Sequence, residues 1–165
     1  MVNVRLDIVS SGKHLDFGEI DCAGYEMLLS RVSQMRHLHS LSIIFLSVPY
    51  DGCVFECERL SGLTNLNSLM ISNYGTNSVR VTSISACKEM PLKELLLKYV
   101  DVDGANVISE FQRLEDLYCT TEELFRRAPS GLRVLYVEDA KFKGDVDLNR
   151  FSMIETLGLL NVKCR

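Results

Sequence analysis

The chain has 165 residues, 47% of them hydrophobic and 24% charged, with a formal net charge of −4. That length and composition fit one folded domain with a buried core and exclude a disordered chain. Because 18 lysines and arginines stand against 22 aspartates and glutamates, no basic surplus remains for a polyphosphate ligand, and we expect no nucleic-acid partner.

The N-terminal segment, residues 1–12, alternates polar and apolar residues and lacks the continuous apolar stretch of a signal peptide. No later segment has the length and hydrophobicity of a membrane span. The six cysteines are scattered and too few for a disulfide framework, which favours free thiols. We therefore expect a cytoplasmic protein, with the nucleus as the alternative, that makes no membrane contact.

The first expected elements are two strands, near residues 4–8 and 15–17. We interpret the first strand as a cap and the second as the start of a longer repeat unit. Residues 24–37 follow, and the apolar residues among them lie close to the spacing of a helical stripe. The N-terminal part of the chain therefore predicts a capping strand, a second strand and a helix.

From residue 38 onward one pattern, apolar-x-x-apolar-x-apolar, recurs six times. Its first position falls at residues 38, 66, 92, 114, 132 and 154, which are 18 to 28 residues apart. The pattern predicts strands near residues 41–44, 69–72, 95–98, 117–119, 135–138 and 157–160. Between the later strands, residues 103–111 and 120–127 carry helix-start signals, and Thr120 with Glu123 matches a capping box.

The spacing of the apolar residues has a direct physical reading. Alternate side chains of a strand point to one face, so the second and third apolar residues of each unit face inward together. One unit cannot bury that face alone, whereas stacked units enclose a continuous core. The alternative is an ordinary doubly wound α/β domain, but its units usually need about 30 residues or more. The pattern therefore favours a parallel sheet of short stacked units.

These units resemble the leucine-rich-repeat family, best in LTNLNSLMISN from Leu63 to Asn73 and more loosely from about Leu15 to Val162. The resemblance implies an α/β solenoid that occupies residues 1–165 as a single domain, with a short parallel sheet on the concave face and helices and loops on the convex face. It also implies a non-catalytic module that binds another protein. The irregular unit lengths resemble the repeats of F-box ubiquitin-ligase adaptors or plant-type immune receptors, so substrate recognition in such a protein is the alternative function.

The family's asparagine or cysteine at the ninth motif position, which ties adjacent turns together, is missing. That position holds Leu46, Tyr74, Val100, Glu122, Ala140 and Val162. We therefore expect an irregular array whose turns are not joined by an asparagine ladder.

If the leucines face inward, the residue between them faces outward from the sheet. This outward row consists of Ser42, Met70, Leu96, Tyr118, Tyr136 and Gly158. Its large members have the composition of an interface core, although a covering segment would make them part of the interior. The candidate partner-binding residues are Met70, Leu96, Tyr118 and Tyr136 in this row and Lys98, Glu94, Asp116 and Glu138 in the two flanking rows. Ser72 belongs to the same flank as Lys98.

Metal binding and catalysis find little support in the residues. His37, His39, Cys53 and Cys57 offer two nitrogens and two sulfurs for zinc, but their spacing matches no known finger order. None of the three histidines lies in a recognisable motif with a nucleophile. We expect no metal, no cofactor and no catalytic residue.

The last expected strand, residues 157–160, is followed by no polar capping segment. Repeat arrays normally carry such caps, and an open strand edge invites pairing with another chain. The sequence therefore predicts either a chain that is part of a longer protein or self-association through this strand.

Overall fold

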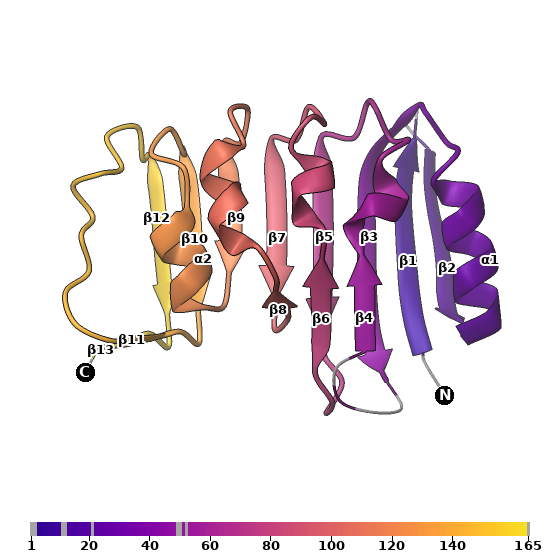
Figure 1. Cartoon of the computed structure of the whole chain (residues 1–165), viewed down its shortest axis with the longest axis horizontal. Coiled ribbons are helices and arrows are strands. Elements are labelled where there is room, and N and C mark those ends of the chain that lie inside the picture. Colours follow the sequence, from indigo (N-terminus) through magenta and orange to yellow (C-terminus); the bar gives the residue numbers. More distant parts are fainter. Residues whose placement is uncertain (1–2, 11–12, 21, 49–50, 52, 165) are drawn as a thin grey trace.

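The computed structural model describes residues 3–10, 13–20, 22–48, 51 and 53–164. Within these residues the main element is an eight-stranded sheet in the order β2-β1-β3-β5-β7-β9-β10-β12 (Figure 1). Its strands are β1 Asn3–Ser10, β2 Lys13–Ile20, β3 Leu38–Ser47, β5 Ser68–Asn73, β7 Glu94–Lys98, β9 Asp116–Cys119, β10 Val134–Glu138 and β12 Thr156–Leu160. From β3 to β12, neighbours in this sheet follow one another in chain order.

Six strands of this sheet, namely β3, β5, β7, β9, β10 and β12, pair in parallel with one another. They lie over the six segments that the recurring pattern predicts, and each of the first five pairs with the next one along the chain without a shift in register. The expectation of an α/β chain with a mostly parallel sheet is confirmed.

The N-terminal strands depart from this parallel arrangement. Strand β1 pairs antiparallel with both β2 and β3, and β2 forms the edge of the sheet. The interpretation of residues 15–17 as the strand of a first stacked unit was therefore wrong. Only two residues separate β1 from β2, whereas a parallel connection needs a crossover of a dozen residues or more.

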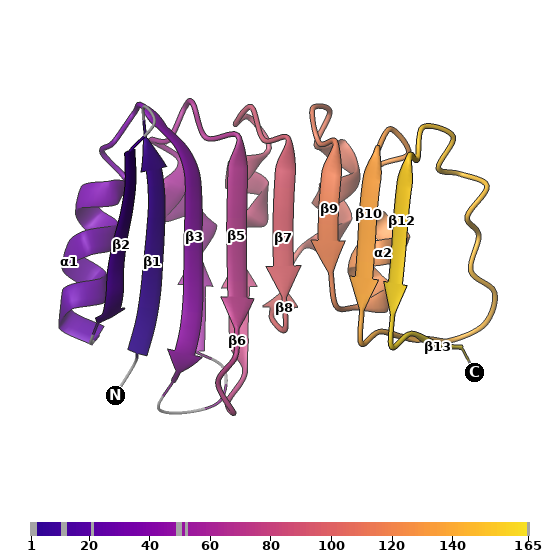
Figure 2. The same ribbon diagram turned by 180° about the vertical axis from the view of Figure 1, so that it is seen from behind.

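A second layer covers one face of the sheet. It lies in front of the sheet in Figure 1 and behind it in Figure 2. Its helices are α1 Cys22–Val32, α2 Glu122–Arg127 and the 3₁₀ helices η1 Cys57–Leu60, η2 Ile84–Cys87 and η3 Ala105–Glu110. Its strands are β4 Cys53–Glu56, β6 Val79–Thr82 and β8 Asp101–Val102, which form a small parallel sheet. Strands β11 Lys141–Phe142 and β13 Lys163–Cys164 pair near the C-terminal end.

The helix expected at residues 103–111 forms as the 3₁₀ helix η3. The chain leaves β8 at Val102 and enters β9 at Asp116, so the return segment is short. A 3₁₀ helix rises about 2.0 Å per residue against 1.5 Å for an α-helix, so it covers more distance with few residues. The expected helix at 24–37 is shorter than predicted, because α1 ends at Val32.

Helix α2 begins one residue later than its capping pattern predicts. Thr121, and not Thr120, is the N-cap, and its hydroxyl accepts a hydrogen bond from the Leu124 amide at 3.3 Å. The Arg150 guanidinium donates to the carbonyls of Phe125 and Arg126 at the other end of the helix. These bonds satisfy helix-end groups that otherwise have no intrahelical partner. They also hold the segment that leads to β12 against α2.

The core lies between the two layers. The inward apolar residues of the first five units are buried, namely Leu41, Ile43, Leu69, Ile71, Leu95, Leu97, Leu117, Cys119, Leu135 and Val137. In the sixth unit, however, Leu157 and Leu159 are 39% and 48% exposed. Strand β12 is the sheet edge and has a neighbour on one side only, so the expectation that its leucines are buried was wrong.

Candidate functional site

The outward row predicted from the sequence is aligned across the sheet by the strand register. Ser42 pairs with Met70, Met70 with Leu96, Leu96 with Tyr118, Tyr118 with Tyr136 and Tyr136 with Gly158. In β3, β5, β7, β9 and β10 the residues immediately before and after the row member are buried between the layers, so this row points to the opposite side of the sheet. That side faces the viewer in Figure 2. We call it the exposed face.

Two tyrosines on the exposed face stack on each other. The ring centroids of Tyr118 and Tyr136 are 4.7 Å apart, and the ring planes differ by 8°. The side chains are 37% and 38% exposed, so they remain accessible. Desolvation raises the pKa of the Tyr118 hydroxyl, and the neighbouring Tyr136 adds to the shift. The stack presents a preformed aromatic surface.

The absence of a side chain at Gly158 makes room for this stack. A Cβ atom at Gly158 would lie 2.1 Å from Cδ1 of Tyr136, which is far inside van der Waals contact. The Tyr136 ring therefore leans over the backbone of β12. Any larger residue at position 158 would displace the ring from its observed place.

A small hollow of about 70 Å³ adjoins the two rings. Five of the predicted partner-binding residues line it, namely Leu96, Lys98, Tyr118, Tyr136 and Glu138. Its exposed lining is mainly apolar. A hollow of this size has room for part of one aliphatic side chain, so the structure brings these predicted residues together in one place.

The flank that contains Lys98 and Glu138 is closed by its own ion pair. Lys98 Nζ lies 2.5 Å from Glu138 Oε2, although strand β9 runs between β7 and β10. Lys98 donates a hydrogen bond to Glu138, and this bond is the main cause of the raised pKa of Lys98. The ammonium also lies 5.7 Å from the ring centroid of Tyr74 and 5.2 Å from that of Tyr99. Both distances allow cation–π contact.

Tyr74 and Tyr99 are exposed residues that the sequence did not mark as candidates. Their rings meet edge to face at 5.9 Å. The Tyr99 hydroxyl donates to Asp139 Oδ2 at 2.6 Å, which raises the pKa of Tyr99 and lowers that of Asp139. Asn161 Nδ2 donates to the other oxygen of Asp139 at 3.1 Å.

One signal in the sequence could have drawn attention to Tyr99, Asp139 and Asn161. Each comes two residues after the last inward apolar residue of its unit. Tyr99, Asp139 and Asn161 directly follow β7, β10 and β12, and their φ angles are 56°, 56° and 54°. Non-glycine residues seldom adopt this left-handed conformation, and asparagine and aspartate tolerate it best. Tyr74 occupies the ninth position of its unit, where the resemblance to leucine-rich repeats implies an asparagine or cysteine. The neighbouring Asn73 instead accepts from the Gly75 amide and donates to the Asn77 carbonyl within its own turn.

The opposite flank carries Glu94 and Asp116 side by side. The register pairs them directly, so two carboxylates occupy neighbouring strands on one face. Desolvation raises the pKa of Asp116, and the charge of Glu94 raises it further. Like charges directly opposite each other destabilise a sheet.

Ser72, expected on the exposed flank beside Lys98, is fully buried. It lies between Ile44 and Lys98 in the register, and both neighbours have longer side chains. Ser72 therefore offers nothing to a partner, and the expectation for this residue was wrong.

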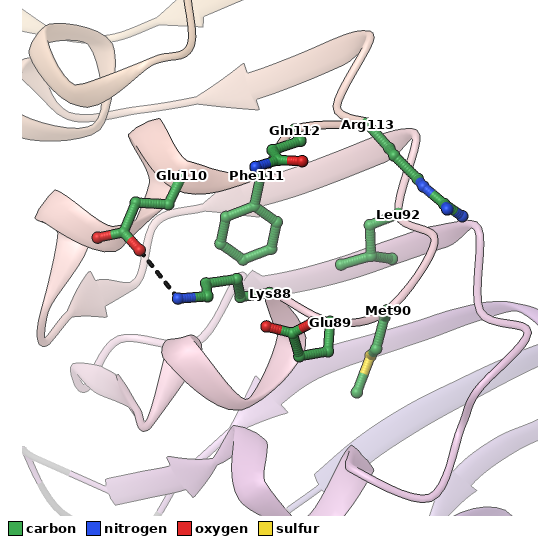
Figure 3. A pocket seen from close by; sticks show the side chains of 8 residues that line it. All are labelled: Lys88, Glu89, Met90, Leu92, Glu110, Phe111, Gln112 and Arg113. Atoms are coloured by element: carbon green, nitrogen blue, oxygen red, sulfur yellow. Dashed lines mark hydrogen bonds and ion pairs between the residues drawn. The ribbon is translucent and has the colours of Figure 1, made fainter.

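A larger pocket of about 230 Å³ lies away from the exposed face, among the loops that precede β7 and β9 (Figure 3). Lys88 Nζ and Glu110 Oε2 are 3.0 Å apart across it, while Arg113 extends away from the other labelled side chains. The hydrogen bond pairs the charges of Lys88 and Glu110 with each other. None of the predicted site residues lines this pocket.

Within the described residues, no group of three or more His, Cys, Asp or Glu side chains is placed to hold a metal ion. The four residues considered for zinc are accordingly not brought together as a ligand set. Cys57 is buried, and its contact with Cys87 raises the pKa of its thiol. The described part of the chain also contains no helix long and apolar enough to cross a membrane.

The exposed face therefore combines a stacked aromatic pair, a small apolar hollow, one self-paired flank and one acidic flank. Such a mixture of aromatic centre and polar rim is typical of protein-binding surfaces. No family model matches the chain, and no curated protein matches it either.

Proposed function

We propose that the chain is a leucine-rich-repeat solenoid that binds another protein through its exposed face. Each unit from residue 38 onward contributes one parallel strand, and consecutive units are neighbours in the sheet. In a repeat solenoid each unit packs only against its neighbours and buries its apolar face between them. The buried leucines of successive units support this interpretation.

The observation that carries the binding function is the stack of Tyr118 on Tyr136. Tyrosine is enriched at protein interfaces because it brings a large contact area with few rotatable bonds. Rings that already hold each other in place lose less side-chain freedom when a partner binds. Both rings remain more than a third exposed, so no described segment takes the place of a partner over them.

The proposal is tested by replacing both rings. A double variant, Tyr118→Ala with Tyr136→Ala, is compared with the wild type and with a control double variant, Met27→Ala with Val54→Ala. The side chains of Met27 and Val54 are 58% and 51% exposed and lie in the other layer. Proteins captured from a lysate by the wild type are identified by mass spectrometry, purified, and titrated against all three proteins. We expect the tyrosine variant to bind at least about tenfold more weakly, and the control variant to bind as the wild type does.

Thermal unfolding keeps this test interpretable. The tyrosine variant should lose the stacking contribution, about 1 kcal/mol, and in addition the contribution from the covered parts of the two rings, but it should still fold cooperatively. Equal binding by the tyrosine variant and the wild type would overturn the proposal. Loss of cooperative unfolding in the tyrosine variant would mean that the rings belong to the core and not to a binding surface.

Self-association through β12 is a separate proposal, favoured by the apolar residues exposed on this edge strand. Leu157, Leu159 and Leu160 are all exposed. Leu159→Lys places a charge on this surface and should leave a monomer if the wild type pairs through it. Light scattering measures the mass in both cases, and a monomeric wild type would contradict the proposal.

A further inference from the structure

The charges on the two sides of the exposed face are not balanced. Lys98 Nζ forms an ion pair with Glu138 Oε2 at 2.5 Å. Lys93, which precedes β7, lies 2.8 Å from Glu115. Arg133, which precedes β10, lies 2.9 Å from Glu155 and 3.7 Å from Glu115. These three cations, which lie in or directly before strands of the sheet, are therefore already paired within the chain.

Glu94 and Asp116 form no such ion pair among the described residues, although the charge of Arg133 acts against the rise in the pKa of Asp116. The register places the two carboxylates next to each other on β7 and β9. Adjacent strands are about 4.8 Å apart, so the two charges repel at close range. Partial burial of Asp116 adds to the cost of its charge. A cation placed between the two carboxylates would relieve both penalties.

The residues beside this pair extend the same surface. Leu96 follows Glu94 by two residues on β7, and Tyr118 follows Asp116 by two residues on β9. Residues two apart in a strand face the same side, about 6.6 Å from each other. An arginine side chain spans this distance, because its aliphatic stem is long and its planar guanidinium both binds carboxylates bidentately and packs on aromatic rings. Tyr136 covers one face of the Tyr118 ring, Leu96 lies beside Tyr118 on the neighbouring strand, and 37% of Tyr118 remains exposed to a ligand.

We propose that the partner of the exposed face is a basic protein segment, with an arginine bound by Glu94 and Asp116 and a neighbouring aliphatic side chain in the hollow beside Leu96, Tyr118 and Tyr136. This inference rests on the proposed binding function and specifies the chemistry of the partner. The two carboxylates on this flank repel an acidic peptide and attract a basic one. On the opposite flank, Lys98 is already paired with Glu138 and therefore adds no attraction for an acidic peptide.

A random dodecapeptide library displayed on phage is the probe. It is selected on the immobilised full chain, and the enriched peptides are synthesised and titrated. We expect enrichment of arginine or lysine next to aliphatic residues. Binding should weaken between about 50 and 500 mM salt, because salt screens exposed charges.

Matched charge-neutral variants locate the contact. Glu94→Gln with Asp116→Asn should weaken the selected peptides at least about tenfold, because the charge-assisted bonds are lost. Asp101→Asn with Glu123→Gln removes the same charge from exposed positions in the other layer and should leave binding within about twofold. Removal of a repulsive pair should not lower the melting temperature of the first variant, so weakened binding would not be due to unfolding.

The outcomes separate this inference from the function on which it rests. Suppose first that the selected peptides lose binding to the Tyr118→Ala and Tyr136→Ala variant. If these peptides are not basic, or if they bind the Glu94→Gln and Asp116→Asn variant as tightly as the wild type, the inference of a basic partner is wrong, whereas the proposed binding face is supported. If the selected peptides bind the tyrosine variant as tightly as the wild type, the exposed face is not the binding surface, and the proposed function fails.

Discussion

The two flanks of the tyrosine row differ although the same strands form both. On one flank, Lys98 reaches across β9 to Glu138 and lies over two further rings. The short side chain of Thr120 follows β9 there and leaves room for this crossing. On the other flank, Glu94 and Asp116 lie on adjacent strands with like charge. In-register stacking places the charges of successive units side by side, so one flank is neutralised by an internal ion pair and the other carries two adjacent carboxylates.

The largest expected effect comes from the row between the flanks. Gly158→Ala places a Cβ atom within 2.1 Å of the Tyr136 ring and should cost about 2 kcal/mol, as for an overpacked site. Ring-current shifts of Tyr118 in NMR spectra should change when Tyr136 is displaced. Gly131→Ala is the control, because a Cβ atom at Gly131 would meet no heavy atom within 4 Å. Equal unfolding free energies of both variants would contradict the close contact.

A smaller effect on stability is expected when the ion pair between Lys98 and Glu138 is removed. The Lys98–Glu138 pair is partly buried, with side chains 22% and 29% exposed. In a double-mutant cycle with Lys98→Met and Glu138→Gln, chemical denaturation should give a coupling of about 1 kcal/mol. The coupling should shrink in high salt. A coupling near zero would mean that this flank is no more satisfied than the acidic one.

A still smaller effect is expected when the acidic flank, formed by Glu94 and Asp116, is given an ion pair like that of the opposite flank. Glu94→Lys replaces the repulsion across β7 and β9 by an ion pair with Asp116, and we expect a gain of about 0.5 kcal/mol in the free energy of unfolding. The same change should abolish binding of basic peptides. Asp101→Lys, at an exposed position of the other layer, provides the charge-matched control. A stabilised variant that still binds basic peptides would separate the two effects and contradict the inferred contact.

The smallest expected effect concerns the pH dependence of the acidic flank. The pKa of Asp116 is raised in the folded chain, so its charged form is disfavoured there relative to the unfolded chain. Asp116→Asn should therefore stabilise the protein by a few tenths of a kcal/mol at neutral pH. The gain should disappear as the pH falls below the usual range for aspartate, where the carboxyl is protonated in both states. Melting curves from pH 3 to 7 measure this difference, and a gain that persists at pH 3 would have another cause.

The repeating part of the fold was predictable because its signal is local. An apolar pattern six residues long marks each strand and assigns Leu69 and Ile71 to the interior, since alternate side chains share a face. Stacking of such units then aligns Met70, Leu96 and Tyr118 in one row without further information. The N-terminal hairpin was not predictable in this way, because the apolar pattern of β2 does not state the direction in which the strand pairs.

The contacts that give the site its character depend on residues far apart in the chain. Tyr99 and Asp139 are 40 residues apart, and they meet because both follow strands in the left-handed conformation. Likewise, Leu157 carries the same pattern as Leu69, yet it is exposed because β12 has one neighbour in the sheet. The sequence by itself determined the strands, the inward leucines and the outward row, since these follow from the period of a strand. Only the tertiary structure decided which charges are paired and which side chains are covered, because pairing and covering depend on neighbours that no local pattern specifies.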